Sequence, residues 1–130
     1  MKNILLLILL FLCGVSAHAQ TYKIYECTLL TEVNGKEVEK KDQKISPNGV
    51  LEFNNNVATI KANDYYEVLY CDPKTFTDAS EGAQKVYLYN AIDSKGIDCD
   101  VMLISYKSAQ MISVVYKYDD TTFHAMFFYK

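Results

Sequence analysis

Short segments rich in Tyr, Val, Ile and Phe alternate with turn-forming residues along most of this chain, and this alternation constrains the fold more than any other feature. Such residues favour extended strands, whereas the intervening clusters of Asn, Asp, Gly and Pro favour tight turns. The predicted strands are 22–32, 37–45, 49–54, 57–62, 64–71, 84–92, 97–107, 110–118 and 121–129. Because strands joined by short connections pair antiparallel, the sequence predicts an all-β protein built as an antiparallel meander of about eight strands.

A meander of this kind can close into a small barrel or fold into a two-layer sandwich, and the sequence leaves both possibilities open. The number and length of the segments resemble the outline of lipocalin-type small barrels. The Gly-x-Trp sequence that this family carries near its first strand is absent, so the resemblance is one of outline and implies no family membership. The charged segment 37–45 is predicted to lie at a sheet edge or to face water on both sides, and its lysines would discourage aggregation between sheets.

One interruption of the strand pattern predicts a short helix near 73–81. Asp72 is suited to cap it, Pro73 fits the first helical position, and Gly82 could end it.

The first nineteen residues have the organisation of a secretory signal peptide. Lys2 provides the positive start, residues 4–12 the apolar run, and Ala17-His18-Ala19 the small-x-small cleavage site. The apolar run is too short to span a bilayer as a helix. We therefore expect cleavage near Ala19 and export to the periplasm or the medium. The mature chain, residues 20–130, would be a single β-rich domain with no membrane span.

The charge of the chain argues against a nucleic-acid partner. The formal net charge is −3, and removal of residues 1–19 would make it −4 because Lys2 is lost and no acid is. All basic residues are lysine, so the two-point grip of arginine on phosphate is missing. The five glycines form no phosphate-binding loop, and no cofactor is predicted.

Three cysteines remain after the expected cleavage: Cys27, Cys71 and Cys99. In an oxidising compartment two of them could form a disulfide, and the sequence does not select the pair. The alternative is that all three are small buried thiols. Their spacing matches no metal site.

Side-chain alternation predicts which residues of the C-terminal strands share a face. A turn at Asp119-Asp120, a second at Ser108-Ala109 and a loop over 93–96 place most apolar side chains on one side of four strands. This predicted core face comprises Val86, Leu88, Ile92, Cys99, Val101, Leu103, Ile112, Val114, Tyr116, Tyr118, Phe123, Ala125, Phe127 and Tyr129. The same register places Asp100 opposite Lys117 as a cross-strand ion pair.

The opposite face carries more apolar residues than a solvent-facing surface should. It is predicted to hold Tyr87, Tyr89, Met102, Ile104, Tyr106, Met111, Val115, His124, Met126 and Phe128. A patch of this kind on a soluble protein indicates that something covers it. The cover could be internal, from the helix near Phe76 or the first strands, or it could be a ligand or a protein partner.

Few residues suit catalysis. His124 is the only histidine beyond residue 20, and it is predicted to be a strand residue at the margin of the second face, not a catalyst. Asp93, Asp98 and Asp100 gather near one end of the sheet, where we interpret them as solvated acids. No catalytic or metal-binding constellation is predicted.

The sequence therefore favours an exported, non-enzymatic protein that holds an apolar or amphipathic small molecule against the Tyr/Met-rich face. The alternative is a module at the cell surface or in the periplasm that binds a protein partner or self-associates, for example as a homodimer. A hydrolase that uses Asp and Glu is the least favoured function.

Overall fold

The structure, a computed structural model, describes residues 20–45 and 48–130. The predicted signal peptide (1–19) lies outside the described residues. The elements in chain order are β1 (Gln20–Val33), β2 (Lys36–Lys44), β3 (Val50–Asn54), β4 (Val57–Ala62), β5 (Tyr65–Cys71), the 3-10 helix η1 (Pro73–Thr75), β6 (Thr77–Asp78), β7 (Gln84–Asp93), β8 (Asp98–Tyr106), β9 (Ala109–Tyr118) and β10 (Thr121–Tyr129). All the predicted strands are present, with ends that differ by at most two residues.

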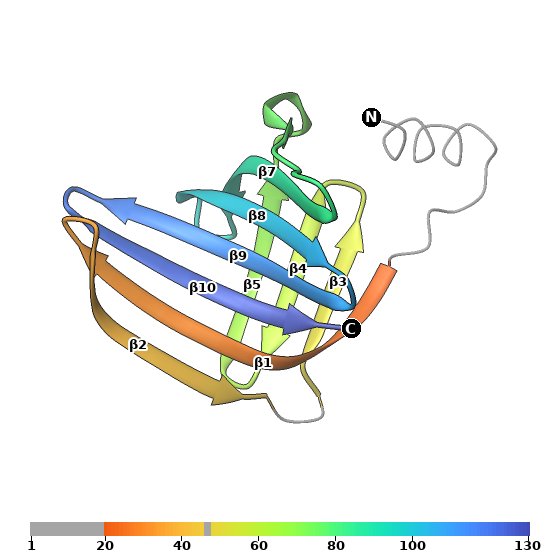
Figure 1. Cartoon of the computed structure of the whole chain (residues 1–130), viewed down its shortest axis with the longest axis horizontal. Helices are drawn as coiled ribbons and strands as arrows, with labels where there is room; N and C mark the ends of the chain where they lie inside the picture. The colour runs from red at the N-terminus through yellow and green to blue at the C-terminus, as the bar shows by residue number, and fades with distance from the viewer. Residues whose placement is uncertain (1–19, 46–47) are drawn as a thin grey trace.

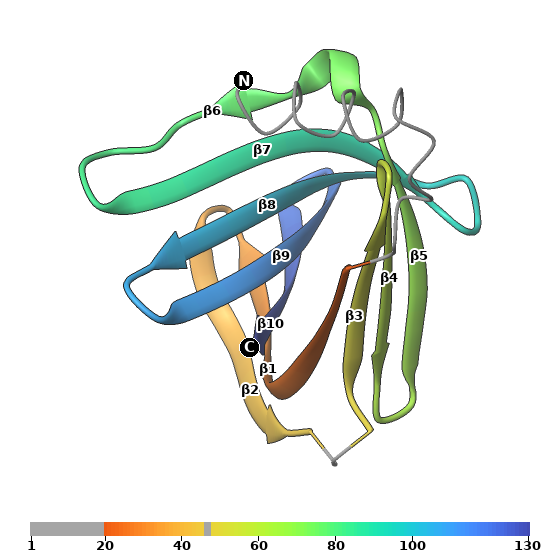
Figure 2. The same ribbon diagram turned by 90° about the vertical axis from the view of Figure 1, so that its right-hand side faces the viewer.

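The strands form a closed antiparallel β-barrel (Figures 1 and 2). The wall follows the order β1-β3-β4-β5-β7-β8-β9-β10, and β10 pairs with β1 to close it. This closure decides between the two predicted architectures in favour of the small barrel. β1 makes it possible through its length: one edge pairs with β10, while the other pairs with β3 over Gln20–Lys23 and with β2 over Glu26–Val33.

Two strands are additions to the barrel wall. β2 follows β1 through a tight turn in which Asn34 and Gly35 both have positive φ (52° and 77°), as a two-residue hairpin loop requires. It pairs with β1 alone among the described strands, and nearly all its residues are exposed. The predicted edge position of this charged segment is thus confirmed. The short strand β6 pairs with β7.

The helix expected over 73–81 is much shorter than predicted. Only Pro73–Thr75 is helical; the Asp72 carboxylate accepts a 3.0 Å hydrogen bond from the Lys74 N–H, so the predicted cap is present. Thr77 and Asp78 are extended and pair with Leu88 and Tyr87 of β7. Helix nucleation is unfavourable, and η1 buries no side chain that would offset it. Pairing with the free edge of β7 gives the backbone its partners instead.

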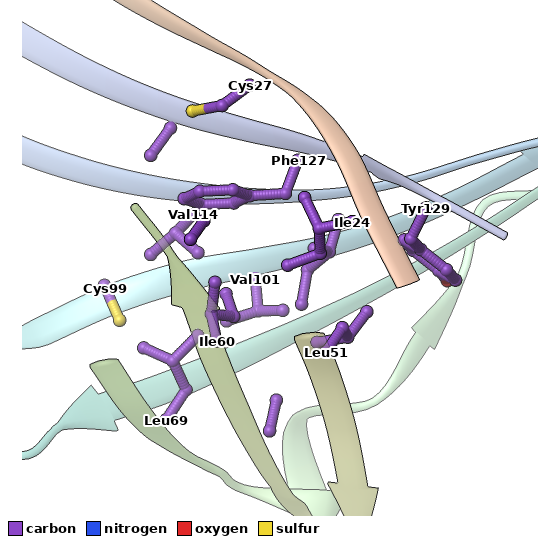
Figure 3. Packing of buried hydrophobic residues seen from close by; sticks show 14 of the residues in the cluster. Ile24, Cys27, Leu51, Ile60, Leu69, Cys99, Val101, Val114, Phe127 and Tyr129 are labelled. Carbon is purple, nitrogen blue, oxygen red and sulfur yellow. The ribbon is translucent and has the colours of Figure 1, made fainter. Parts of the chain in front are cut away.

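The interior of the barrel is filled by side chains (Figure 3). Val101, Val114 and Phe127 point inward together, as predicted, and each is at most 1% exposed. The other fully buried apolar residues come from around the wall: Ile24, Leu51, Ile60, Leu69 and Ile112. The middle of the barrel is therefore a packed hydrophobic core.

For β8, β9 and β10, the prediction of which side chains face inward and which face outward is confirmed. The β9–β10 turn is at Asp119-Asp120, as predicted, and Val114 lies opposite Ala125. The β8–β9 turn is at Lys107-Ser108, one residue earlier than predicted. Asp100 consequently faces Val115 instead of Lys117, a shift of two residues that leaves every side chain on its predicted face. The Asp100 and Lys117 charges still approach to 3.9 Å along the diagonal.

The predicted register of β7 is wrong by one residue. Tyr89 lies opposite Val101 and Ala91 opposite Cys99, so Tyr87 and Tyr89 face the interior. Val86, Leu88 and Ile92, predicted to face the core, lie on the outer side, and Ile92 is 47% exposed. The connection spans residues 93–97 and is closed by a 2.9 Å bond from the Asp93 N–H to the Ile97 carbonyl. Its odd length reverses the two faces of β7 relative to the four-residue loop that we predicted.

The disulfide predicted as possible is not formed: Cys27, Cys71 and Cys99 are free thiols. Cys71 and Cys99 both lie opposite Ala91, on its two sides, so they are two strands apart. Two strand spacings separate their Cα atoms by about 9–10 Å, beyond the roughly 7 Å that a disulfide can bridge. The alternative, small buried thiols, fits Cys27 and Cys99, whereas Cys71 is partly exposed.

Within residues 20–45 and 48–130, the structure contains no helix with the length and apolar character needed to cross a membrane.

Candidate functional site

Eight of the ten predicted site residues share the outer side of β8, β9 and β10. Strand pairing arranges them in rows that cross the three strands: Asp100-Val115-His124, Met102-Ser113-Met126 and Ile104-Met111-Phe128, with Tyr106 at the end of β8. We call these rows the outer face. Tyr87 and Tyr89 do not belong to it, because β7 has the opposite register to the one predicted.

The described elements leave the outer face uncovered. Phe76, beside η1, was one predicted cover, but its ring packs on Tyr87 and Tyr89 at the inner side, with centroid distances of 5.5 and 5.2 Å. Of the first strands, the other predicted cover, β1 and β3 are part of the barrel wall and β2 extends from β1. The outer side chains shield one another instead: Ser113, between Met102 and Met126, is only 1% exposed.

One part of the outer face is hollowed into a groove of about 570 Å³. Leu88, Met102 and Val115 are apolar parts of its lining, whereas Asp100 and Lys117 make it charged. Threonines at 75, 77 and 122 add further polar surface. The groove therefore combines apolar and charged side chains.

His124 lies at the margin of the outer face, as predicted. Its Nε2 contacts Oε1 of Glu32 on the neighbouring strand β1, and both side chains are mostly buried. The carboxylate partner gives this histidine a role in joining β10 to β1, where the barrel closes.

A second concave surface lies inside one end of the barrel, and we call it the aromatic end. It has a volume of about 360 Å³ and takes residues from the start of β1, the end of β3, the middle of β7, the hairpin of β8 and β9, and the end of β10. Its lining residues are Gln20, Tyr22, Phe53, Asn55, Tyr87, Tyr89, Leu103, Ile104, Ser105, Gln110 and Tyr129.

The rings of the aromatic end form two groups. Tyr22 contacts Phe53 and Tyr129, with centroids 6.0 and 5.0 Å apart. The second group consists of Tyr87 and Tyr89, both of which also contact Phe76, a residue outside the lining. Burial, together with the neighbouring Tyr22, raises the pKa of Tyr129 to about 12, so this phenol is uncharged at neutral pH.

A third concave surface lies at the opposite ends of β1, β9 and β10, and we call it the β2 end. It has a volume of about 320 Å³ and an apolar floor that includes Leu29, Tyr65 and Phe123. Glu39 and Lys41 of β2 add charges to its lining. The packed core separates the β2 end from the aromatic end.

Two buried acids anchor the loop between β7 and β8. Asp93, interpreted from sequence as solvated, is only 4% exposed and accepts bonds from the Lys95 and Ile97 N–H groups (both 2.9 Å). Burial by itself would raise the pKa of Asp93, but hydrogen bonds from Ile97, Tyr116 and Lys95 lower it below its ordinary value. The carboxylate therefore serves as an acceptor for loop donors.

Glu67 on β5 is the second anchor. Its Oε1 accepts hydrogen bonds from the Ser94 hydroxyl (2.6 Å), the Ser94 N–H (3.0 Å) and the Val68 N–H (3.1 Å). Both acids thus have structural partners. In the described part of the chain, no three His, Cys, Asp or Glu side chains are grouped so that they could hold a metal ion.

Sequence reasoning named Tyr87, Tyr89 and Ile104 as site residues, but it did not bring them together with Tyr129. Tyr22 and Phe53 join this end through the non-local pairing of β1 with β10 and with β3. Comparison of the chain with known protein families, with curated proteins and with solved structures found no match.

Proposed function

We propose that this protein is a non-enzymatic binding protein that holds a small apolar or amphipathic ligand at the aromatic end of its barrel. The observation that carries the proposal is the concave space between Tyr22, Phe53 and Tyr129 on one side and Tyr87 and Tyr89 on the other. Its volume of about 360 Å³ falls within the range of small-molecule pockets, which are usually apolar and aromatic with a few polar groups. Tyrosine offers both an apolar ring and a hydroxyl to such a ligand.

The aromatic end suits a small ligand better than the outer face does. Its rings come from strands on both sides of the barrel and can surround a molecule. The outer rows form a sheet surface, and the groove within them has charged Asp100 and Lys117 in its lining. We therefore assign the ligand to the inner side of Tyr87 and Tyr89.

A binding role also agrees with the hydrogen bonding of the two buried acids, which serve the fold. Asp93 and Glu67 accept hydrogen bonds from loop donors; the Asp93 bond closes the connection between β7 and β8, and the Glu67 bond attaches that connection to β5. Together with the signal-like residues 1–19, this supports an exported carrier in the periplasm or the medium.

Binding of the uncharged fluorescent dye N-phenyl-1-naphthylamine tests the proposal. Dye fluorescence should rise on addition of the purified protein, and Tyr87→Ala should weaken binding by about tenfold, since the contact area of one ring is lost. Tyr66→Ala is the matched control, because Tyr66 is 59% exposed on β5. Equal dye binding by the Tyr87→Ala protein and the wild type would contradict the assigned site.

A second candidate function is association with another protein through the outer face. The observation that favours it is the set of apolar rows that no described element covers. Sedimentation should then show a wild-type assembly that Met102→Lys or Met126→Lys dissociates, while the control Tyr70→Lys on the outer side of β5 does not. Wild-type protein that sediments as a monomer would exclude self-association.

A further inference from the structure

We propose that the ligand of the aromatic end is an uncharged carbohydrate, an inference that rests on the proposed function above. The first argument is charge. None of the described side chains that line the aromatic end is charged, whereas the β2 end contains Glu39 and Lys41, and the outer groove contains Asp100 and Lys117. Burial of an unpaired charge is costly, so a site without charged side chains disfavours ionised ligands.

The second argument is the polar part of the lining. Gln20, Asn55, Ser105 and Gln110 are the uncharged polar residues of this end, beside five aromatic rings. Side-chain amides and hydroxyls both donate and accept hydrogen bonds, as the hydroxyl groups of a sugar do. A sugar can use these groups as hydrogen-bond partners, whereas a purely hydrocarbon ligand cannot.

The third argument is the arrangement of the rings. The interplanar angles are 74° for Tyr22 and Phe53 and 57° for Tyr22 and Tyr129. Rings tilted in this way form a cup with several facets. A puckered sugar ring can rest its apolar C–H face on one facet and direct its hydroxyls toward the polar rim.

One contact shows how the rim can respond to a ligand. The Tyr22 hydroxyl donates a 3.2 Å hydrogen bond to Oε1 of Gln20, an exposed pair at the start of β1. The NH₂ of this amide can donate to a ligand hydroxyl while its oxygen keeps Tyr22 in place. Tyr22 is thereby a positioning residue for Gln20 at the mouth of the cup.

The experiment uses the mature chain with ¹³C-labelled tyrosine rings and four defined probes. Cellohexaose, xylohexaose and maltohexaose are the neutral oligosaccharides, and hexagalacturonate is the charged one. At least one neutral probe should shift the ring resonances of Tyr22, Tyr87 and Tyr129, leave that of Tyr66 unchanged, and displace N-phenyl-1-naphthylamine. Hexagalacturonate should bind at least tenfold more weakly.

Two variants test the roles of ring and rim. Gln110→Ala removes an amide without altering a ring and should raise the Kd of the neutral probe about two- to tenfold, the effect of losing one hydrogen bond. Tyr66→Ala should leave that Kd unchanged. Unaltered affinity of the Gln110→Ala protein would overturn the role of the polar rim.

The outcomes distinguish the inference from the proposed function. If the dye binds at the aromatic end and no neutral oligosaccharide shifts its tyrosines, the carbohydrate assignment is wrong and the binding function stands. The assignment is equally wrong if hexagalacturonate binds as tightly as the neutral probes. If neither dye nor oligosaccharide perturbs Tyr22, Tyr87 or Tyr129, the proposed function fails as well.

Discussion

The hydroxyl of Tyr116 on β9 donates a 3.0 Å hydrogen bond to Oδ2 of Asp93, which is buried at the end of β7. Tyr116→Phe would remove this donor and leave the carboxylate buried. We expect the variant to lose about 1–3 kcal/mol of unfolding free energy, the usual cost of a buried acceptor that loses its partner. Urea unfolding measures this loss. Tyr118→Phe is the control, because Tyr118 is 48% exposed, and it should change stability by less than about 0.5 kcal/mol.

The same acid makes the fold sensitive to low pH. Burial acts to raise the pKa of Asp93, but its three hydrogen bonds lower it overall in the folded protein. Its contribution to stability is therefore complete above the ordinary Asp pKa of about 3.9, and it is lost as the pH falls through the lowered value of the folded state. Unfolding free energies measured between neutral pH and about pH 3 should show this decline. In Asp93→Asn the decline should be smaller; an identical pH profile would show that Asp93 is not responsible.

The interior thiols should be unreactive in the folded protein. Burial raises the pKa of Cys27 to about 11, and burial together with Asp93 raises that of Cys99 to about 12. Since the thiolate is the reactive form, Ellman's reagent at mildly alkaline pH should label both cysteines slowly until urea unfolds the chain. Rapid labelling of Cys27 in the native protein would contradict its position in the core.

These thiols also predict a loss of stability in alkali. Their pKa values are higher in the folded protein than the ordinary value of 9.0, so the unfolded chain ionises first. The stabilisation is complete below about pH 9 and is lost as the pH rises through the folded values. Melting temperatures should fall over this range, and they should fall less in the Cys27→Ala, Cys99→Ala double variant.

Two phenylalanines on the same side of β10 should differ in their effect on stability. Phe127 is fully buried, and its ring centroid lies 5.0 Å from that of Tyr65. Phe127→Ala should cost about 3–5 kcal/mol, because it leaves a cavity in the packed core. Phe123 is 42% exposed, and Phe123→Ala should cost much less. If urea unfolding showed that both variants lose similar unfolding free energy, the packed core would extend as far as Phe123, contrary to its position here.

The sequence predicted the C-terminal strands well because their turns are short. With a two-residue turn at Asp119-Asp120, the alternation of apolar residues leaves one register for β9 and β10. Even the displaced turn between β8 and β9 kept each side chain on its predicted face. The alternation of apolar residues therefore predicts which face each side chain occupies, provided that the loop between the strands has an even number of residues.

The faces of β7 could not be predicted, because they depend on one buried carboxylate. Asp93 resembles a solvated loop acid in the sequence, and only the folded protein supplies donors from Ile97 and Tyr116. Those bonds fix a five-residue connection and turn Tyr87 and Tyr89 inward. The aromatic end was missed for a related reason, since Tyr22 and Phe53 reach it through barrel closure, a long-range pairing that no local pattern encodes.

Because side chains fill the middle of the barrel, the aromatic end and the β2 end are two separate concave surfaces that open in opposite directions, and the barrel is not a tube. Among the described residues, the buried layer around Phe127 closes the barrel in the middle, so a ligand that enters at one end would have to leave at the same end. β1, β9 and β10 contribute residues to both ends and so connect the two concave surfaces.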